Sequence, residues 1–388
     1  MWAFRLTGKR KESRSYPMRL THAEIDLNKL RNNLNEVKRA ISPGVKIMGI
    51  VKANAYGHGL VEISKALVSN GIDYLGVGFL EEGIILRQEG ITAPILVLGG
   101  VLGSQIREFL ENNLEITVSS IEIAERIEQE VQREDRKKAR VHLKIDTGME
   151  RIGVHAETAL PFVERVSRMP HIDVLGIYSH FATSDERDKS FVKNQLNRFT
   201  ELLQKVKSAG IHIPEIHFAS SGAILDSPDT YFTMVRPGII LYGVYPSQET
   251  SERFPVEPIL TLKSNVVFLK ELALGTSISY GRKYYTKDRI RVATVPIGYG
   301  DGYSRGLTNI GEVLIREKRF PVVGVVCMDQ IMVNVGHEAE VHVGDEVVLI
   351  GSSGDQNISV WDLALKSGTN AYEFLTGLAA RVPRKFLH

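Results

Sequence analysis

The chain has 388 residues, of which 43% are hydrophobic and 24% charged, so it can form two or three domains, or one large barrel with an addition. Lys and Arg number 48 against 46 for Asp and Glu, and this near balance excludes a general attraction to nucleic acid or membrane surfaces. The single cysteine, Cys327, excludes an intrachain disulfide and a cysteine-based metal cluster, and is typical of a cytoplasmic protein.

The first twenty residues are expected to be a basic extension. Glu12 is the only acidic residue among residues 1–19, and the basic ones are Arg5, Lys9, Arg10, Lys11, Arg14 and Arg19. No apolar segment of a secretory signal follows them. We expect a tail that frays or packs on the surface, and a nucleic-acid-binding arm is the weaker alternative.

Residues 21–250 alternate short apolar runs with amphipathic segments. A helix is predicted over Ile121–Val131, where apolar residues recur every three or four positions. The runs predicted as strands are Lys46–Val51, Asp73–Val77, Pro94–Leu98, Leu114–Val118, Val141–Ile145, Val174–Tyr178, Glu215–Phe218 and Tyr231–Val235. Eight strands, each followed by helical material, predict a parallel (β/α)8 barrel of the TIM type. An open, doubly wound sheet is the alternative.

The pattern changes after residue 250, where Pro255 and Pro258 mark a boundary. Turn residues then separate runs of β character. These runs are Ile259–Leu269, Arg291–Val295, Glu312–Ile315, Val322–Val326, Ile331–Val335 and Glu346–Ile350. Only Asp362–Lys366 and Tyr372–Ala380 have a helical pattern. Residues 251–388 are therefore predicted to form a second, mostly β domain.

A lysine stands at the end of the first predicted barrel strand. In "VKANAYGHG" (51–59), Lys52 follows the apolar run from Ile47 to Val51. An unpaired ammonium rarely lies in such a place, because burial removes its hydration. Schiff-base formation with an aldehyde is one function that benefits from burial of a lysine, since burial lowers the amine pKa and favours the nucleophilic form.

Two later strands lead into loops with small and hydroxyl-bearing residues. Ser220, Ser221 and Gly222 follow the seventh predicted strand, and Gly238 and Ile239 follow the eighth. In barrels of this type, these two loops often bind phosphate with the N-terminus of a short helix. Each loop alone could be an ordinary turn. Together with Lys52, the loops favour pyridoxal phosphate as a cofactor.

Nine motifs, in order along nearly the whole chain from about Thr21, resemble those of the alanine racemase family. They are "AEIDLNKLRNNL" (23–34), "VKANAYGHG" (51–59), "DTGMERIG" (146–153), "SHFATSD" (179–185), "RPGIILYG" (236–243), "SISYG" (277–281), "IGYGDGYSR" (297–305), "CMDQ" (327–330) and "ARVPR" (380–384). The resemblance implies interconversion of L- and D-alanine by two bases, through an external aldimine of pyridoxal 5′-phosphate. It also implies a supply of D-alanine for cell-wall peptidoglycan.

The resemblance also implies roles for individual residues. Lys52 would hold the cofactor and act as the base for D-alanine, and Tyr280 would be the base for L-alanine. Arg236 would face the pyridine nitrogen, and Arg151 and the backbone N–H of Met328 would bind the substrate carboxylate. The remaining cofactor-binding residues would be Tyr56, His180, Ser221, Gly238, Ile239 and Tyr372.

Two further expectations follow from the family. Tyr280 would come from the partner chain of a homodimer with two shared sites. Lys144 would carry a carbamate that supports Arg151, and a bound anion such as chloride is the alternative. The arginine at position 236 bears on the reaction type, because a permanently protonated arginine does not give the pyridine nitrogen a proton. The ring then withdraws less charge, which suits racemisation better than transamination.

Other interpretations have weaker support. "GYSRG" (302–306) satisfies the G-x-S-x-G pattern of serine hydrolases but precedes turn-like residues, and Gly76-Val77-Gly78 lacks the third glycine of a dinucleotide fingerprint. The histidines are scattered, so we predict no metal site. A pyridoxal-phosphate carrier would not need the β domain or Tyr280. A decarboxylase of basic amino acids would need an acidic residue at the pyridine nitrogen, where Arg236 stands.

Overall fold

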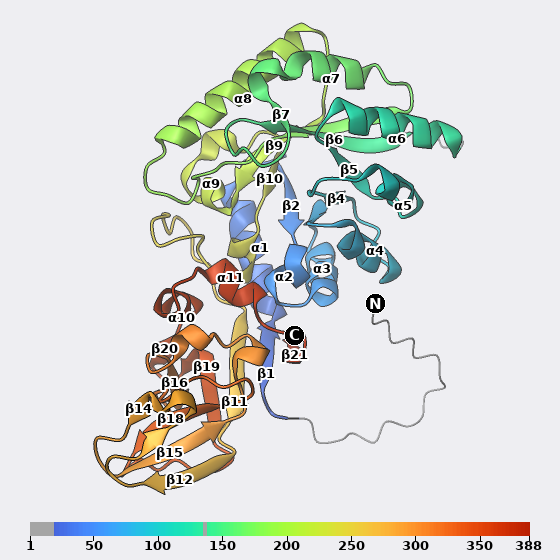
Figure 1. The fold of residues 1–388 in the computed structure, drawn as a ribbon. Coiled ribbons are helices and arrows are strands. Elements are labelled where there is room, and N and C mark those ends of the chain that lie inside the picture. Colours follow the sequence, from blue (N-terminus) through green and yellow to red (C-terminus); the bar gives the residue numbers. More distant parts are fainter. Residues whose placement is uncertain (1–18, 135–137) are drawn as a thin grey trace, which may run out of the picture.

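The structure is a computed structural model, which describes residues 19–134 and 138–388. Eight parallel strands pair in the order β5-β4-β3-β2-β10-β9-β8-β6, and β6 pairs again with β5 to close a barrel (Figure 1). The strands are β2 (Lys46–Ile50), β3 (Tyr74–Val77), β4 (Ile95–Val97), β5 (Glu115–Val118), β6 (Ala139–Asp146), β8 (Ile172–Tyr178), β9 (Glu215–Ser220) and β10 (Met234–Arg236). The predicted barrel is confirmed, and the open sheet is excluded.

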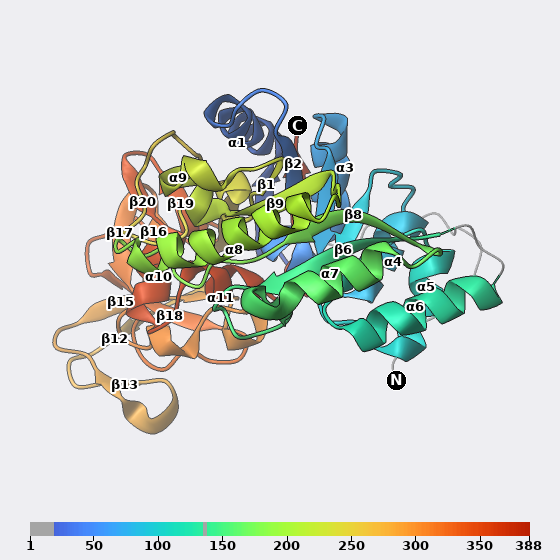
Figure 2. The ribbon, with the colours of Figure 1, turned by 90° about the horizontal axis from the view of Figure 1, so that it is seen from above.

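Helices cover the outside of the barrel, and Figure 2 shows α6, α7 and α8 lying along the side of β6 and β8. The helices of this part are α1 (Leu27–Ala40), α2 (Lys52–Tyr56), α3 (Leu60–Ser69), α4 (Leu80–Gln88), α5 (Ile106–Glu111), α6 (Ile121–Arg133), α7 (Ala159–Ser167), α8 (Ser190–Ser208) and α9 (Ser221–Asp226). In α6, Ala124, Ile127 and Val131 are buried as their spacing predicts. A short strand, β7 (Val154–His155), pairs with β6.

The segment "AEIDLNKLRNNL" joins the two parts of the chain. Its strand β1 (His22–Asp26) pairs with strands from the C-terminal part and not with the barrel. Asp26 ends β1 and begins α1, because its carboxylate accepts the N–H groups of Asn28 and Lys29. On α1, the buried Asn33 amide donates to the carbonyls of Leu241 and Glu257. The interval 21–250, expected from sequence to be the barrel, thus begins with a strand that belongs elsewhere.

The C-terminal part is mostly β, as predicted. Its largest sheet has the order β17-β16-β19-β11-β1-β21, with β20 on β19, and a three-stranded sheet has the order β12-β15-β18. Its strands are β11 (Leu260–Asn265), β12 (Phe268–Leu272), β13 (Ser277–Ile278), β14 (Tyr284–Tyr285), β15 (Ile290–Val295), β16 (Glu312–Ile315), β17 (Lys318–Pro321), β18 (Ile331–Gly336), β19 (Glu346–Ser353), β20 (Gln356–Ile358) and β21 (Arg384–Leu387).

The strand predicted over Val322–Val326 is wrong. Only Val322 forms a bridge, with Val333, and Gly324 then takes a left-handed conformation with φ of +78°. That conformation turns the chain out of the sheet. The loop which follows carries Cys327 and Met328. Two helices, α10 (Val360–Lys366) and α11 (Ala371–Thr376), complete this part near the positions predicted for them.

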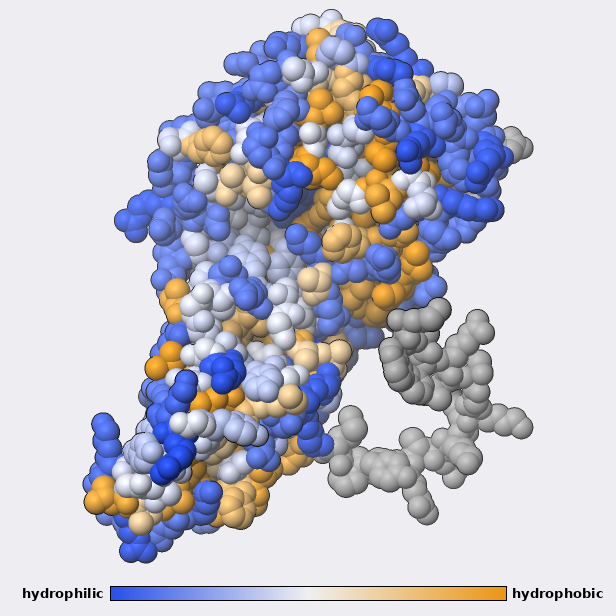
Figure 3. Space-filling view, in the orientation of Figure 1, coloured by the Kyte–Doolittle hydropathy of each residue, from blue (hydrophilic) through white to orange (hydrophobic). Residues whose placement is uncertain are grey.

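The two parts lie one above the other, with the helix α11 against α2 at the barrel (Figure 1). Figure 3 shows the resulting elongated surface, with apolar residues over the barrel around β4. Within the described residues, no helix is long and apolar enough to cross a membrane. Of the basic extension expected over residues 1–20, only Arg19 and Leu20 lie among the described residues.

Candidate active site

One cavity of about 730 Å³ opens at the carboxyl ends of the barrel strands. Parallel barrels bring residues from distant parts of the sequence together at this end. Ten of the twelve predicted site residues line the cavity, and they are Lys52, Tyr56, Lys144, Arg151, His180, Ser221, Arg236, Gly238, Ile239 and Tyr372. Tyr372 reaches it from α11, and its ring lies 6.0 Å from that of Tyr56.

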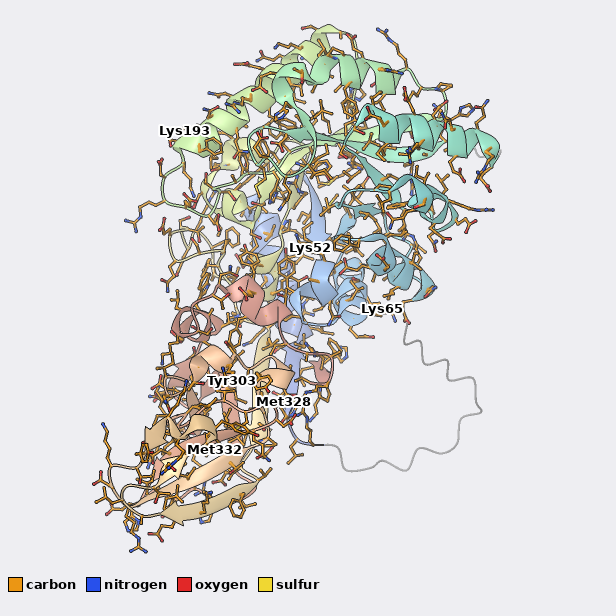
Figure 4. The ribbon with its side chains drawn as sticks, in the orientation of Figure 1. Lys52, Lys65, Lys193, Tyr303, Met328 and Met332 are labelled. Carbon is orange, nitrogen blue, oxygen red and sulfur yellow. The ribbon has the colours of Figure 1, made fainter. Side chains whose placement is uncertain are left out.

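Two predicted site residues do not line this cavity. Tyr280 follows β13, and 72% of its surface is exposed. Met328 is 52% exposed on the loop before β18. Figure 4 shows Lys52 at the barrel and Met328 in the β part of the same chain. A single chain therefore presents Lys52 and Tyr280 at two different places.

Lys52 is the first residue of α2, and a left-handed turn follows it. Residues 53–56 all have φ between 52° and 56°, and Gly57 follows with φ of 83°. Non-glycine residues pay steric strain in this region, so the surrounding contacts must hold the turn. The Lys52 side chain is partly open to the cavity and not enclosed as the sequence predicted. Desolvation by the surrounding protein, followed by the charge of Arg151, still lowers the pKa of its amine, while Glu82 opposes this effect.

Glu82 holds the turn next to Lys52, and the sequence analysis missed it. One carboxylate oxygen accepts the N–H of Ala53 at 2.6 Å, and the other accepts the N–H of Gly78 at 2.8 Å. Gly78 also leaves room for the lysine stem, because a Cβ at this position would lie 3.4 Å from Lys52 Cβ. The carboxylate therefore links the end of β3 to the lysine-bearing turn. The acidic pair at 81 and 82 in the first turn of α4 was the available signal.

Arg236 is buried at the end of β10 and donates to several acceptors. Its Nη2 donates to the carbonyls of Ser179 at 2.7 Å and Phe218 at 3.1 Å. Its Nη1 lies 3.0 Å from His217 Nδ1. Burial lowers the pKa of Arg236 to about 10, which leaves the guanidinium protonated near neutral pH. Among the described residues, no carboxylate forms an ion pair with it, so it is a cationic donor inside the cavity.

Another part of the cavity lining has the features of an anion cradle. Ser221 Oγ accepts the N–H of Gly238 at 2.9 Å, and no side chain among the described residues caps the N-terminus of α9. A Cβ at Gly238 would lie 2.6 Å from the Tyr56 hydroxyl, so only glycine fits. Burial raises the pKa of Tyr56 and of Tyr372, which keeps both phenols protonated as donors. Hydroxyls and backbone N–H groups of this kind suit a phosphate.

Lys144 is buried on β6 and lines the cavity together with Arg151. Within the described residues, its amine has one long hydrogen-bond contact, 3.3 Å to the carbonyl of Ile145, and it lies 4.9 Å from the centre of the Tyr178 ring. Burial, and then the charge of Arg236, lowers the pKa of Lys144 to about 7. Within the described part of the chain, no carboxylate pairs with Arg151. The structure thus places a readily deprotonated amine beside an arginine that has no anionic partner there.

The structure excludes two of the alternatives. Ser304 is no nucleophile elbow, because it precedes a 3-10 turn and its Oγ accepts the N–H of Gly306 at 3.1 Å. Gly78 packs against Lys52 and Glu82, as described above, so Gly76-Val77-Gly78 does not open a dinucleotide site. In the described residues, no three His, Cys, Asp or Glu side chains are grouped so that they could hold a metal ion.

Comparisons with known proteins agree with this geometry. The model of the alanine racemase N-terminal domain matches residues 25–246, and that of the C-terminal domain matches residues 259–386. Alanine racemase 2 of Caldanaerobacter subterraneus subsp. tengcongensis is 44% identical over 372 residues, which cover 96% of this chain and 96% of that protein.

Solved structures give the same result. Alanine racemase from Clostridium difficile 630 has a TM-score of 0.91 and 41% identity, covering 96% of this chain and 97% of that one. A histidine racemase from Leuconostoc mesenteroides subsp. sake has a TM-score of 0.88 and 30% identity, covering 96% and 99%. The fold is therefore that of amino-acid racemases built from a barrel and a β domain. Within this class of enzymes, the chain belongs to the alanine racemase family.

Proposed function

We propose that this enzyme interconverts L- and D-alanine with pyridoxal 5′-phosphate and two bases, and that it supplies D-alanine for peptidoglycan in the cytoplasm. The observation that carries the mechanism is the combination of groups in one cavity. Lys52, the Ser221–Gly238 cradle and Arg236 at the end of β10 all line it. An amine, a cationic donor and a phosphate cradle match the aldehyde, ring nitrogen and phosphate of that cofactor.

The residues that would hold the cofactor follow from this arrangement. Lys52 would bond to its aldehyde, and Arg236 would donate to its ring nitrogen. Ser221, Gly238 and Ile239 would hold the phosphate with Tyr56 and Tyr372, while His180 would lie beside the ring. When bound, the cofactor withdraws electrons from the substrate's α-carbon and so acidifies its hydrogen. Because Arg236 keeps its own proton, this withdrawal stays moderate.

Proton transfer requires one group on each face of the substrate. The Lys52 amine would take the α-proton from D-alanine, and the lowered pKa raises the fraction of amine able to do so. The phenol of Tyr280 would serve the other face. Because Tyr280 lies far out on the β part of its own chain, we propose that the site takes Tyr280 and Met328 from the partner of a homodimer. Large exposed side chains at the cavity rim, such as Phe79 at 67%, support a partner surface here.

The substrate carboxylate would lie between Arg151 and the N–H of Met328. For Arg151 to be held in place, it needs an anion, and a carbamate on Lys144 would supply one. That modification forms a bond between Nζ and the carbon of CO₂, and the amine loses one proton. A neutral amine is required, and a pKa near 7 makes it available at physiological pH. Bound chloride beside Arg151 is the alternative.

The test combines a visible spectrum with a racemisation assay. We expect purified protein to bind one pyridoxal phosphate per chain and to racemise alanine faster than serine or histidine. Histidine is included among the substrates tested because a histidine racemase shares the fold. Cofactor binding without racemisation would point to a carrier. Release of CO₂ from lysine or arginine would point to the decarboxylase alternative, and either result would overturn the proposal.

A further inference from the structure

A line of four buried polar side chains crosses the barrel interior from Arg236 to the opposite end of the strands. Arg236 Nη1 lies 3.0 Å from His217 Nδ1, and His217 Nε2 lies 2.9 Å from His142 Nδ1. His142 Nε2 lies 2.9 Å from Glu115 Oε2. Both imidazoles are fully buried, and Glu115 is 1% exposed. We refer to Arg236, His217, His142 and Glu115 as the barrel column.

The two ends of the column determine where every hydrogen lies. Arginine can only donate, so His217 Nδ1 must offer a lone pair, and a neutral His217 then carries its hydrogen on Nε2. That hydrogen points at His142 Nδ1, which must accept, so His142 carries its hydrogen on Nε2 and donates to Glu115. A carboxylate accepts only, so the direction derived from Arg236 and the direction required by Glu115 agree.

The reverse arrangement fails at the mouth of the barrel. If His217 carried its hydrogen on Nδ1, two N–H groups would face each other across 3.0 Å at Arg236. Glu115 removes this possibility, because it gives the His142 Nε2–H an acceptor in a place without water access. The Arg140 guanidinium supplies a countercharge, with Nε 3.6 Å from Glu115 Oε1. Without Glu115, one buried N–H would lose its partner.

The packing holds both rings in these positions. The Tyr178 ring stacks on His217, with centres 4.7 Å apart and planes 6° from parallel. The Tyr74 ring meets His142 edge-on at 6.2 Å. On β8, a Cβ at Gly176 would lie 2.1 Å from His142 Nδ1, so the absence of a side chain leaves room for the ring. The rings cannot rotate freely, and the tautomers of His142 and His217 therefore decide whether every N–H group in the column has an acceptor.

We propose that Glu115 is a positioning residue that acts through His142 and His217 to keep Arg236 directed as a donor into the cavity. No proton has to move along the column for this role. The part of the proposal that concerns the cofactor rests on the proposed function, since Arg236 meets the pyridine nitrogen only if pyridoxal phosphate binds here. The hydrogen positions in the protein itself do not depend on it.

The first experiment measures ring protonation in the unaltered protein by two-bond ¹H–¹⁵N correlation of ¹⁵N-histidine, with and without cofactor. Signals of His142 and His217 are assigned from His142→Gln and His217→Gln among the 11 histidines. We expect both rings to be neutral with hydrogen on Nε2. Hydrogen on Nδ1 of His217, or a doubly protonated ring, would overturn the proposal.

The second experiment compares Glu115→Leu with Glu215→Leu. Glu215 is a matched control, because it is another buried carboxylate at the same end of the barrel and pairs with Lys46 instead of a histidine. We expect Glu115→Leu to give mixed tautomers at His217 and to weaken pyridoxal-phosphate binding about tenfold, the effect of one hydrogen bond to a charged group. We expect Glu215→Leu to leave both within about twofold, as a change outside the column should.

Equal effects of the two substitutions would overturn the role of Glu115. If Glu115→Leu does not fold, Gly176→Ala takes its place, because the added methyl group must displace the His142 ring. We then expect the same mixture of tautomers at His217, in place of hydrogen on Nε2 alone. A parent protein that shows the expected tautomers yet neither binds pyridoxal phosphate nor racemises alanine would refute the proposed function, while the column would stand.

Discussion

The barrel mouth and the β13–β18 edge of the C-terminal part contribute to one proposed reaction in different ways. At the mouth, Lys52, Arg236 and the Ser221–Gly238 cradle line one cavity of one chain, and hydrogen bonds to buried groups hold Arg236 and the cradle. At the edge, Tyr280 and Met328 are mostly exposed and line no part of that cavity. On the proposed function, one chain builds the cofactor site but leaves the second base and part of the substrate site to its partner.

Tyr280→Phe should separate the contribution of the barrel mouth from that of the β13–β18 edge most clearly. Racemisation needs both faces, so we expect net turnover to fall by about 10²–10⁴, the usual effect of losing a positioned acid–base group. Lys52 can still remove and return the α-hydrogen of D-alanine. In D₂O, the variant should therefore exchange D-alanine with solvent much faster than L-alanine, as measured by ¹H NMR.

A packing role for Tyr280 would give a different pattern. Loss of a merely structural ring should slow the exchange of both enantiomers alike. Equal residual exchange, or racemisation near the parent rate, would contradict the assignment of Tyr280 as the second base.

Gly238→Ala should damage the barrel mouth and leave the β edge unaffected. Its methyl group would lie 2.6 Å from the buried Tyr56 hydroxyl and distort the cradle. Overpacking of this kind costs about 1–3 kcal/mol, so we expect pyridoxal-phosphate binding to weaken about tenfold or more in a fluorescence titration. Gly100→Ala, where the nearest atom is Ile152 Cδ1 at 3.3 Å, is the control and should bind almost normally. Equal binding by both variants would contradict the cradle.

Lys144 should make the barrel mouth dependent on pH and CO₂. Because its pKa is lowered to about 7, the amine is mostly protonated below that pH and mostly neutral above it. At constant dissolved CO₂, carbamate should therefore increase from pH 6 to pH 8, because the neutral fraction alone rises about tenfold and the proton released on carbamate formation favours it further at high pH. ¹³C NMR with labelled CO₂ measures it, and Lys144→Met should abolish the signal. A signal absent at every pH, with activity that depends on chloride, would favour the alternative anion.

Ala53→Gly tests the strain beside Lys52, and its effect should be the smallest. Ala53 is exposed with φ of 52°, where glycine avoids the steric cost, so we expect cofactor-free protein to gain about 0.5–1 kcal/mol of unfolding free energy. Ala66→Gly in the right-handed helix α3 should instead lose about 1 kcal/mol. Denaturant melts measure both, and loss of stability in both variants would show that the turn is not strained.

Much of the barrel could be predicted from sequence, because each strand is a short apolar run followed by an amphipathic segment. The pairing of β1 with β11 and β21 could not, since it joins residues more than two hundred positions apart and depends on tertiary contacts. The left-handed turn after Lys52 was also missed. Alanine and asparagine at 53 and 54 carry no glycine signal for a positive φ, and Glu82 on helix α4 supplies the hydrogen bond that holds the turn.

The cavity residues were found mainly through the resemblance to the family, while the residues behind them were not. His142 and His217 were among the scattered histidines to which the sequence assigned no role, and both are buried. Their connection to Arg236 and Glu115 depends on which side chains point into the barrel. Alternation along β6 places His142 and Lys144 on the same inward face, and this was the signal available before the structure.

The shared site is the central claim, and mixing two variants tests it most directly. Lys52→Ala and Tyr280→Phe chains are combined under conditions in which heterodimers are shown to form. If the partner supplies Tyr280, each heterodimer has one intact site and one with both lesions. Statistical mixing should then restore about a quarter of the parent's activity, as two-fold symmetry requires. Chains carrying both substitutions, mixed with the parent, should give inactive heterodimers. No recovery in the first mixture, together with half-active heterodimers in the second, would contradict the account.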